Sequence, residues 1–252
     1  MRVVIVGAGT VGQWFAGETA GWLDPIFVDS NPEQAVNAAT KCGGDAWSHD
    51  EITSVPIICT AVPLTSTAPV LEQYIPYAEE ACIDLSGAMR DPLAAMNSGE
   101  RDVERISLHP LFAPENAPGN IAAVIENEGP IWSQCLQRLT HAGNNVFETT
   151  PEYHDRAMET VQAKVHAAII AFALAAEPVE SQFHTPISEE LDTLARSVLT
   201  GSPRVYADIQ ATFDGAEIVA QAAADIADAD SERFEELFWE AKSRIDTSSR
   251  DQ

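Results

Sequence analysis

Three glycines near the start of the chain have the spacing of a dinucleotide-binding loop. Gly7, Gly9 and Gly12 follow the β-branched run 2–6 and precede an apolar, helix-like segment, so the order is strand, turn, helix. In this G-x-G-x-x-G pattern the first glycine allows a tight turn, the second lets the backbone approach a pyrophosphate, and the third lets helix and strand pack closely. The helix N-terminus also offers N–H groups to phosphate oxygens. The loop therefore predicts dinucleotide binding.

Asp29 predicts which dinucleotide binds. It stands 17 residues after Gly12, at the end of the apolar run 25–28. An acid at this place accepts hydrogen bonds from the ribose hydroxyls of adenosine and repels a 2′-phosphate. Residues 30–32 offer no Arg or Lys that would reverse the preference. We therefore expect NAD rather than NADP.

The elements that position these residues alternate between strand and helix over the first 150 residues. Strands are expected at 2–6, 25–28, 55–63, 81–85, 105–108, 121–125 and 145–149, and later helices at 32–42, 66–77 and 130–141. This alternation predicts a doubly wound Rossmann sheet, in which ligands bind at the carboxyl ends of strands. The end of the run 55–63 should then border the cofactor, although it is also a strand that simply stops at proline. The expected cofactor-binding residues are Gly7, Gly9, Thr10, Val11, Gly12, Asp29, Ala61, Val62 and Pro63.

From Pro151 the pattern changes to long helices. One is expected over 155–176, where Asp155, Glu159, Gln162 and His166 form a polar stripe beside an apolar face. Such a stripe is usually solvated, but this helix follows the sheet domain directly and can face its open edge. Further helices are expected at 189–199, from Pro203 to about 226, and from about 231. We expect an all-α domain over 151–246, suited to dimerisation, with a monomeric bundle as the alternative, and a flexible tail at 247–252.

The charge balance narrows the classes of partner. There are 39 acidic residues against 14 Lys and Arg, a formal net charge of −25, while 45% of residues are apolar. Nucleic acid and anionic membranes are poor partners for such a chain. A halophilic cytoplasm is the expected setting, because concentrated salt screens the repulsion between carboxylates. No run of bilayer length, no leader segment and no metal-ligand spacing is seen, so we expect a cytoplasmic protein without a metal.

Several motifs together resemble the prephenate dehydrogenase (TyrA) family. The glycine loop is shared by many families, but His-Pro-x-Phe-x-Pro, a helix that opens with His-Asp, and Gln-Ala-x-x-His further along it are more specific in that order. The resemblance covers nearly the whole chain. The residues that carry it are Gly7–Gly12, Ala61–Pro63, His109–Pro114, Glu152–Arg156, Gln162–His166 and Ser202–Ile209.

The resemblance implies an NAD-binding domain at 1–150, a helical domain that forms a homodimer, and oxidative decarboxylation of prephenate to 4-hydroxyphenylpyruvate. It implies that His109 is the catalytic base for the ring hydroxyl, work suited to an imidazole. It also implies that His166 binds substrate and that His154 and Asp155 organise the site. The alternatives are a surface histidine before a turn for His109, a structural role for His166, and helix capping for His154 and Asp155.

The chain departs from the family at two places. Where the family has Asp-x-x-Ser-x-Lys, residues 84–89 place Gly87 at the serine and Met89 at the lysine, and Ser86 is a weak substitute because strand alternation would point it elsewhere. Arg196 is the nearest match to the family's substrate-binding arginine, with a surface salt bridge as the alternative. Arogenate is the alternative substrate, and a non-catalytic NAD-binding redox sensor is the alternative from another class.

Overall fold

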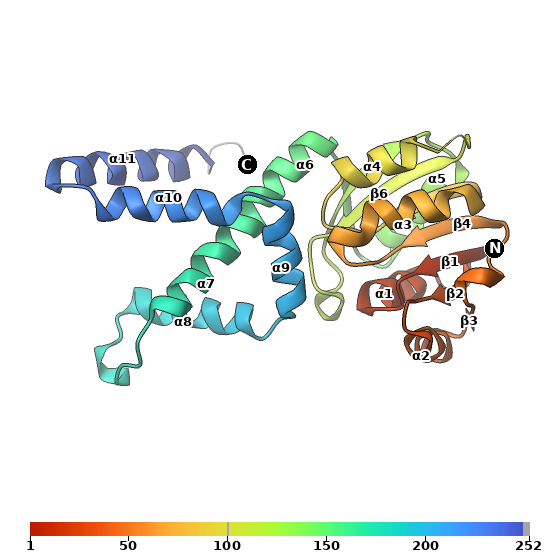
Figure 1. Cartoon of the computed structure of the whole chain (residues 1–252), viewed down its shortest axis with the longest axis horizontal. Coiled ribbons are helices and arrows are strands. Elements are labelled where there is room, and N and C mark those ends of the chain that lie inside the picture. The colour runs from red at the N-terminus through yellow and green to blue at the C-terminus, as the bar shows by residue number, and fades with distance from the viewer. Residues whose placement is uncertain (100, 249–252) are drawn as a thin grey trace. The chain divides into compact units, whose positions relative to one another are not determined.

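Eight strands form one sheet in the order β3-β2-β1-β4-β5-β6-β7-β8 (Figure 1). The computed structural model describes residues 1–99 and 101–248. Neighbouring strands are parallel except β6 and β7, which are antiparallel. The strands are β1 Arg2–Val6, β2 Asp24–Val28, β3 Asp45–Ala46, β4 Val55–Thr60, β5 Ala78–Asp84, β6 Glu104–Pro110, β7 Asn120–Glu126 and β8 Asn145–Glu148.

Six helices belong to the same unit as the sheet. They are α1 Thr10–Glu18, α2 Pro32–Cys42, α3 Thr67–Tyr74, α4 Arg90–Asn97, α5 Pro130–His141 and α6 Pro151–Met158. The buried side chains of α1, α2 and α5 join one apolar cluster and those of α3 and α4 join another, so helices cover both faces of the sheet. Along β1, Val3 and Ile5 enter the first cluster while Val4 and Val6 enter the second, as expected for a parallel strand buried on both faces. The doubly wound Rossmann fold is confirmed.

The expected elements differ from the observed ones in three details of this unit. The two-residue β3 and the helix α4 were not predicted, because neither has a long periodic pattern. The strand expected over 55–63 ends at Thr60, since the chain leaves the sheet before Pro63. The reversal at β7 follows from the short connection after β6, because a parallel crossover needs a dozen or more residues.

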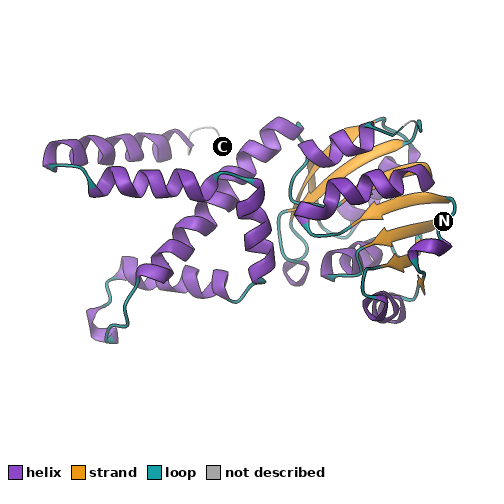
Figure 2. Cartoon of the chain, in the orientation of Figure 1, coloured by secondary structure: helices purple, strands orange, loops and turns teal. Residues whose placement is uncertain are grey.

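The second unit is helical, and all strands of the described chain lie in the first (Figure 2). Its elements are a π-helical segment Glu159–Lys164, α7 Val165–Ala175, α8 Pro186–Leu199, α10 Gly215–Ala227 and α11 Ser231–Ser248. Helix α9 Pro203–Thr212 is shared, because only its residues 203–206 belong to this unit. Within it, α7 packs against α8, and α10 packs against the π-helical segment and α7. A Cβ on Gly215 would stand 2.5 Å from the Cβ of Ala163, so glycine is needed for this approach.

The described chain divides into two compact units. The first unit comprises residues 1–158 together with Ala207–Thr212, and the second comprises Glu159–Tyr206 and the chain from Phe213 onward. The first unit therefore extends beyond residue 150 to include α6, whose His154 and Asp155 are hydrogen-bonded to residues of the sheet unit. The long helix expected from Pro203 is broken between Thr212 and Gly215. Of the tail expected at 247–252, the first two residues are helical and the other four lie outside the described residues.

The helical stretch Pro151–Ala175 corrects the expectation that no run reaches bilayer length. It has 25 residues and a mean hydropathy of 1.2 in its most apolar window, so length and composition alone would allow it to cross a membrane. Only 17% of that window is buried. Its first turns, however, hold His154 and Asp155 in buried hydrogen bonds with the sheet unit, which are typical of a helix packed in a protein core.

Candidate active site

The glycine loop lies between β1 and α1 and is held against the end of β4. Gly7 has φ +103°, and a Cβ on it would stand 2.2 Å from the carbonyl oxygen of Ala61. A Cβ on Gly12 would stand 2.3 Å from the carbonyl oxygen of Gly7. A Cβ on Gly9, by contrast, would meet no described atom within 4 Å beyond its chain neighbours. Two glycines are thus fixed by packing, and the third leaves open space where a pyrophosphate could approach the backbone.

Asp29 joins the end of β2 to the glycine loop. Its Oδ2 accepts the N–H of Ala8 at 2.9 Å, and its Oδ1 accepts the N–H of Asn31 at 2.8 Å. On the other side, the N–H of Ala61 donates to the carbonyl of Val6 at 2.8 Å. The predicted cofactor residues of β1, β2 and β4 are therefore neighbours at the carboxyl ends of adjacent parallel strands, where doubly wound sheets bind their ligands.

His109 begins a buried chain of hydrogen bonds. Its side chain comes from β6, and only 8% of the residue is exposed, so the alternative of a surface histidine is wrong. The Nδ1 of His109 lies 3.0 Å from the Nε2 of His154, and the Nδ1 of His154 lies 2.8 Å from Asp155 Oδ1. All three residues belong to the sheet unit. The first turns of α6 therefore support the strand that carries the predicted base.

Asp155 is held by the start of α4. The N–H of Met89 donates to Oδ1 at 2.9 Å, and the N–H and Nε of Arg90 donate to Oδ2 at 3.2 and 3.0 Å. Burial opposes ionisation, but the hydrogen bonds from His154, Met89 and Arg90 outweigh it and lower the pKa of Asp155. Asp155 is therefore a carboxylate at neutral pH, and it joins α6 to α4.

The environment of His109 keeps its imidazole neutral. Burial, together with the smaller effect of the neighbouring His154, lowers the pKa of His109 to about 3, while Asp155 acts in the opposite direction. A neutral imidazole has one unprotonated ring nitrogen. At physiological pH, His109 is therefore neutral and can accept a hydrogen bond from a hydroxyl.

A second buried carboxyl group, Asp84, lies at the end of β5. It accepts hydrogen bonds from the hydroxyls of Ser86 at 2.7 Å, Thr60 at 3.0 Å and Ser107 at 3.3 Å. Burial raises the pKa of Asp84 to about 6, although these hydroxyls act to lower it. The Ser86 hydroxyl also lies 2.9 Å from the carbonyl of Ala88, so its single proton is directed within this buried cluster. Ser86 was a candidate for binding substrate. In the structure its hydroxyl contacts Asp84 and the carbonyl of Ala88 at the end of β5.

Gly87, at the position of the family's serine, lies beside His109. A Cβ on Gly87 would stand 3.5 Å from Nε2 and 3.6 Å from Cε1 of the imidazole, and no other described atom beyond the chain neighbours lies within 4 Å of that point. A Cβ would therefore fit here in ordinary van der Waals contact with the imidazole, and the glycine leaves that small volume beside Nε2 without a side chain. The contacts of Gly87, Arg90 and Asp84 were missed by sequence reasoning, and the available signal was their place near the end of the strand predicted over 81–85.

His166 and Arg196 belong to the helical unit, which is described by itself. The His166 ring packs edge-on against Tyr206, with centroids 4.8 Å apart. Burial lowers the pKa of His166, and no hydrogen-bond partner for its buried Nδ1 is found among residues 1–99 and 101–248. Arg196 instead pairs with Asp192 at 2.9 Å, and its side chain is 77% exposed. For Arg196, the surface ion pair left open by the sequence is what the structure shows.

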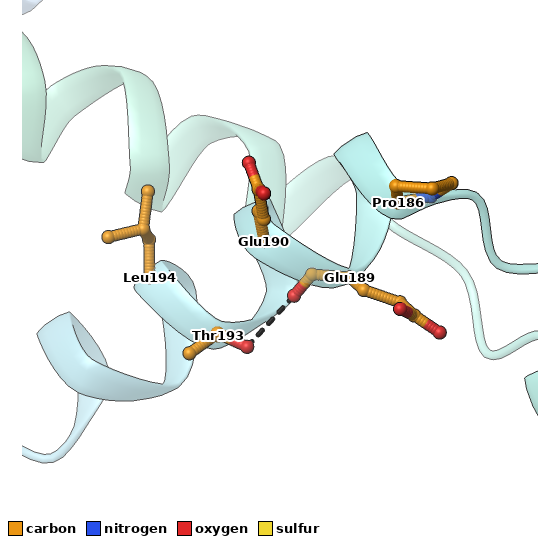
Figure 3. Close-up of a pocket in the computed structure, with 5 residues that line it drawn as sticks. All are labelled: Pro186, Glu189, Glu190, Thr193 and Leu194. Carbon is orange, nitrogen blue, oxygen red and sulfur yellow. Dashed lines mark hydrogen bonds between the residues drawn. The ribbon is translucent and has the colours of Figure 1, made fainter.

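Two surface pockets, one on α2 and one on α8, are lined by residues other than the predicted site residues. Figure 3 shows one of about 500 Å³ on α8, where Thr193 Oγ1 donates to the carbonyl of Glu189 at 2.9 Å. It is lined by Pro186, Glu189, Glu190, Thr193 and Leu194. Two carboxylates make it a poor site for phosphates or for an anionic substrate. Within the described chain, no group of three or more His, Cys, Asp or Glu could hold a metal ion.

Two curated proteins similar to this chain are both named as dehydrogenases, and both names refer to prephenate or a derivative of it. No family profile matches this chain. It is 25% identical over 227 residues to a protein of Methanocaldococcus jannaschii named as a probable arogenate/prephenate dehydrogenase, covering 82% of this chain and 50% of that protein. It is 27% identical over 250 residues to a 4-amino-4-deoxyprephenate dehydrogenase of Streptomyces pristinaespiralis, covering 87% of this chain and 80% of that protein. The chain thus spans about half the length of the first relative.

A solved structure shares the fold. The prephenate dehydrogenase from Aquifex aeolicus, crystallised with hydroxyphenyl propionate and NAD+, superposes with a TM-score of 0.67 at 15% identity, and 98% of each chain is covered. The similarity extends over both units. It confirms the predicted order of the two parts, a Rossmann domain followed by a helical part.

Proposed function

We propose that this chain, a relative of the prephenate dehydrogenase family, is an NAD-dependent dehydrogenase that acts on prephenate. The observation that carries the proposal is the buried, neutral His109, whose Nε2 borders the open space beside Gly87. Strands β1, β4, β5 and β6 are adjacent and parallel, so the glycine loop, Ala61–Pro63, Gly87 and His109 all lie along one edge of the sheet. The cofactor loop and the proposed base therefore lie at the same end of the sheet, which is formed by the carboxyl ends of these strands.

The residues present fit the pyrophosphate of NAD. Gly9 leaves the backbone accessible, α1 begins at Thr10, and Asp29 stands at the end of the next strand. The first N–H groups of a helix have no partner within it, so those of α1 suit the phosphate oxygens. NAD, when bound, supplies the acceptor for a hydride. Asp29 would bind the ribose hydroxyls and repel a 2′-phosphate.

His109 moves the proton in the proposed reaction. Its Nε2 takes the proton of the ring hydroxyl while hydride leaves the same ring carbon. The bond to the ring carboxylate then breaks, CO2 departs, and the electron pair of that bond enters the ring. His109 returns the proton to the ring oxygen, so that prephenate and NAD+ give 4-hydroxyphenylpyruvate, CO2 and NADH. His166 stays a proposed substrate-binding residue, and its buried Nδ1, which has no hydrogen-bond partner among the described residues, supports this assignment.

Turnover of three substrates tests the proposal. NADH formation is followed with prephenate, with arogenate, and with 4-amino-4-deoxyprephenate, the substrate in the name of the Streptomyces relative. We expect prephenate to have the highest kcat/KM. A preference for another of the three would replace the substrate and keep the reaction class, whereas NAD binding without any turnover would favour the redox-sensing alternative.

Replacement of the base tests the role of His109. His109→Asn should lower kcat by about 10²–10⁴-fold, because a positioned acid–base group typically contributes that much. NAD affinity should be nearly unchanged. His141→Asn, a change at an exposed histidine of α5, is the matched control and should keep the wild-type rate. An unaltered kcat in His109→Asn would reject the assigned role.

We also propose that the helical unit forms a homodimer. Large apolar side chains of α7, α8 and α11 are exposed in the single chain, among them Leu174 at 83%, Ile187 at 79% and Ile245 at 70%. Surfaces of this kind mark protein–protein contacts, and a second copy of the chain would cover them. Sedimentation equilibrium should give twice the chain mass. A monomer at all concentrations would contradict this.

A further inference from the structure

We infer that His154 and Asp155 are positioning residues that hold His109 in the tautomer with an unprotonated Nε2. The inference rests on the proposed function of His109 as the base. It gives a definite form to the expected roles of His154 and Asp155, which the family resemblance implied to organise the site. In this arrangement they act on His109, and His109 acts on the substrate.

The direction of each hydrogen bond follows from the carboxylate at one end. Asp155 accepts from the backbone N–H groups of Met89 and Arg90 and from Arg90 Nε, and an ionised carboxylate can only accept. The Nδ1 of His154, 2.8 Å from Asp155 Oδ1, must therefore carry the proton of that contact. A neutral His154 then has a lone pair on Nε2.

The lone pair on Nε2 of His154 determines which ring nitrogen of His109 carries the proton. The contact between His154 Nε2 and His109 Nδ1 is 3.0 Å, and a hydrogen bond of this length needs one donor. Because His154 Nε2 is the acceptor, the proton lies on Nδ1 of His109. A neutral imidazole has a single ring proton, so Nε2 of His109 is left free to accept another.

The free nitrogen borders the space that Gly87 leaves open. The nearest described atoms to a Cβ at Gly87 would be Nε2 and Cε1 of His109, at 3.5 and 3.6 Å. A reacting hydroxyl beside Gly87 would therefore meet the unprotonated nitrogen. The opposite tautomer would present an N–H there and could not take a proton.

The contacts among His109, His154 and Asp155 are shielded from water, and the carboxylate at their end is fixed by backbone groups. The side chains of His154 and Asp155 are 1% and 4% exposed, so water cannot readily replace either partner. The carboxylate is fixed by two backbone N–H groups at the start of α4, which do not depend on side-chain rotamers. Serine proteases use an aspartate in the same way to set the tautomer of their histidine, and there a wrong tautomer costs about 10⁴-fold in kcat.

The tautomer can be measured without turnover. In protein labelled with ¹⁵N-histidine, the two ring nitrogens of His109 are assigned by their loss in His109→Asn. We expect Nδ1 to be protonated and Nε2 unprotonated at neutral pH. A protonated Nε2 in the wild-type protein would overturn the inference, whether or not the enzyme turns over prephenate.

Two substitutions at His154 separate a relay from simple packing. His154→Gln places an amide oxygen near the position of Nε2 and can still accept from His109, whereas His154→Phe keeps a ring of similar shape but has no acceptor. The relay predicts that kcat falls at least tenfold more in the Phe variant than in the Gln variant, with KM for prephenate little changed and the Nε2–H form of His109 newly populated. A packing role predicts the opposite order, with Phe better tolerated.

The outcomes distinguish this inference from the proposed function. If prephenate is not turned over but the labelled His109 shows the expected tautomer, the relay holds and the assigned reaction fails. If prephenate is turned over and His154→Phe retains both kcat and the tautomer, the reaction holds and the relay fails. Should His154→Phe not fold, the wild-type tautomer still decides.

Discussion

Replacing Asp84 with asparagine should change how stability depends on pH. Asp84 is fully buried, and burial raises its pKa from 3.8 to about 6 even though Ser86, Thr60 and Ser107 donate hydrogen bonds to it. Below pH 3.8 the group is protonated in both the folded and the unfolded chain and has no effect. As pH rises towards 6, only the unfolded chain ionises readily, so the folded state loses stability.

The magnitude follows from the two pKa values. Each pH unit between them changes the free energy of unfolding by about 1.4 kcal/mol for one group. From 3.8 to about 6, Asp84 should therefore lower the stability by about 3 kcal/mol, and the loss should be complete above pH 6. Asp84→Asn cannot ionise, so its stability relative to the wild type should rise by about that amount across the window.

Urea unfolding from about pH 4 to pH 7 at constant salt measures the difference. His109 titrates in the opposite direction, because its lowered pKa costs stability as pH falls below 6.5. Subtracting the wild-type curve from that of Asp84→Asn removes the His109 contribution, which both proteins share. Asp50→Asn, at an exposed carboxyl group, is the control and should give a curve parallel to the wild type. A parallel curve for Asp84→Asn would refute the reasoning.

Three further predictions concern the loop, the cofactor and the charge. Gly7→Ala should destabilise the fold by more than about 1 kcal/mol in urea unfolding, because φ is +103° and the added Cβ would clash with Ala61. The control Gly17→Ala should be neutral or stabilising. Asp29→Asn should lower the preference for NAD over NADP in kcat/KM by about tenfold or more, and an unchanged ratio would count against the assigned role. Added KCl, up to multimolar concentration, should raise the unfolding midpoint, and equal stability throughout would contradict a halophilic protein.

Local signals in the sequence were sufficient for much of the sheet unit. The helix α5 has the predicted limits, and Gly7 and Gly12 are fixed by the close contacts that the fingerprint implies. In each case the structure depends on residues close together in the chain. The hydroxyl of Ser86 is bonded to Asp84, and whether Ser86 replaces the serine of the family stays a prediction.

The histidine relay could not be derived from local patterns. His109 and His154 are 45 residues apart, and Met89 and Asp155 are 66 apart, so their contacts depend on how β6, α4 and α6 pack. The sequence shows an acid next to a histidine, which fits helix capping equally well. The π-helical segment Glu159–Lys164 was also missed, because a helical period does not reveal a local change of winding.

The reversal of direction between β6 and β7 has a consequence for the loop that follows the base. Strand β7 starts opposite Pro110. After His109 the chain therefore turns back at the carboxyl end of β6, through residues 111–119. Phe112 in this turn meets the edge of Trp14 from α1, with ring centroids 5.6 Å apart. Helix α1, which follows the glycine loop, and the segment that follows His109 are therefore linked by an aromatic contact, and a substitution of Trp14 would remove this link.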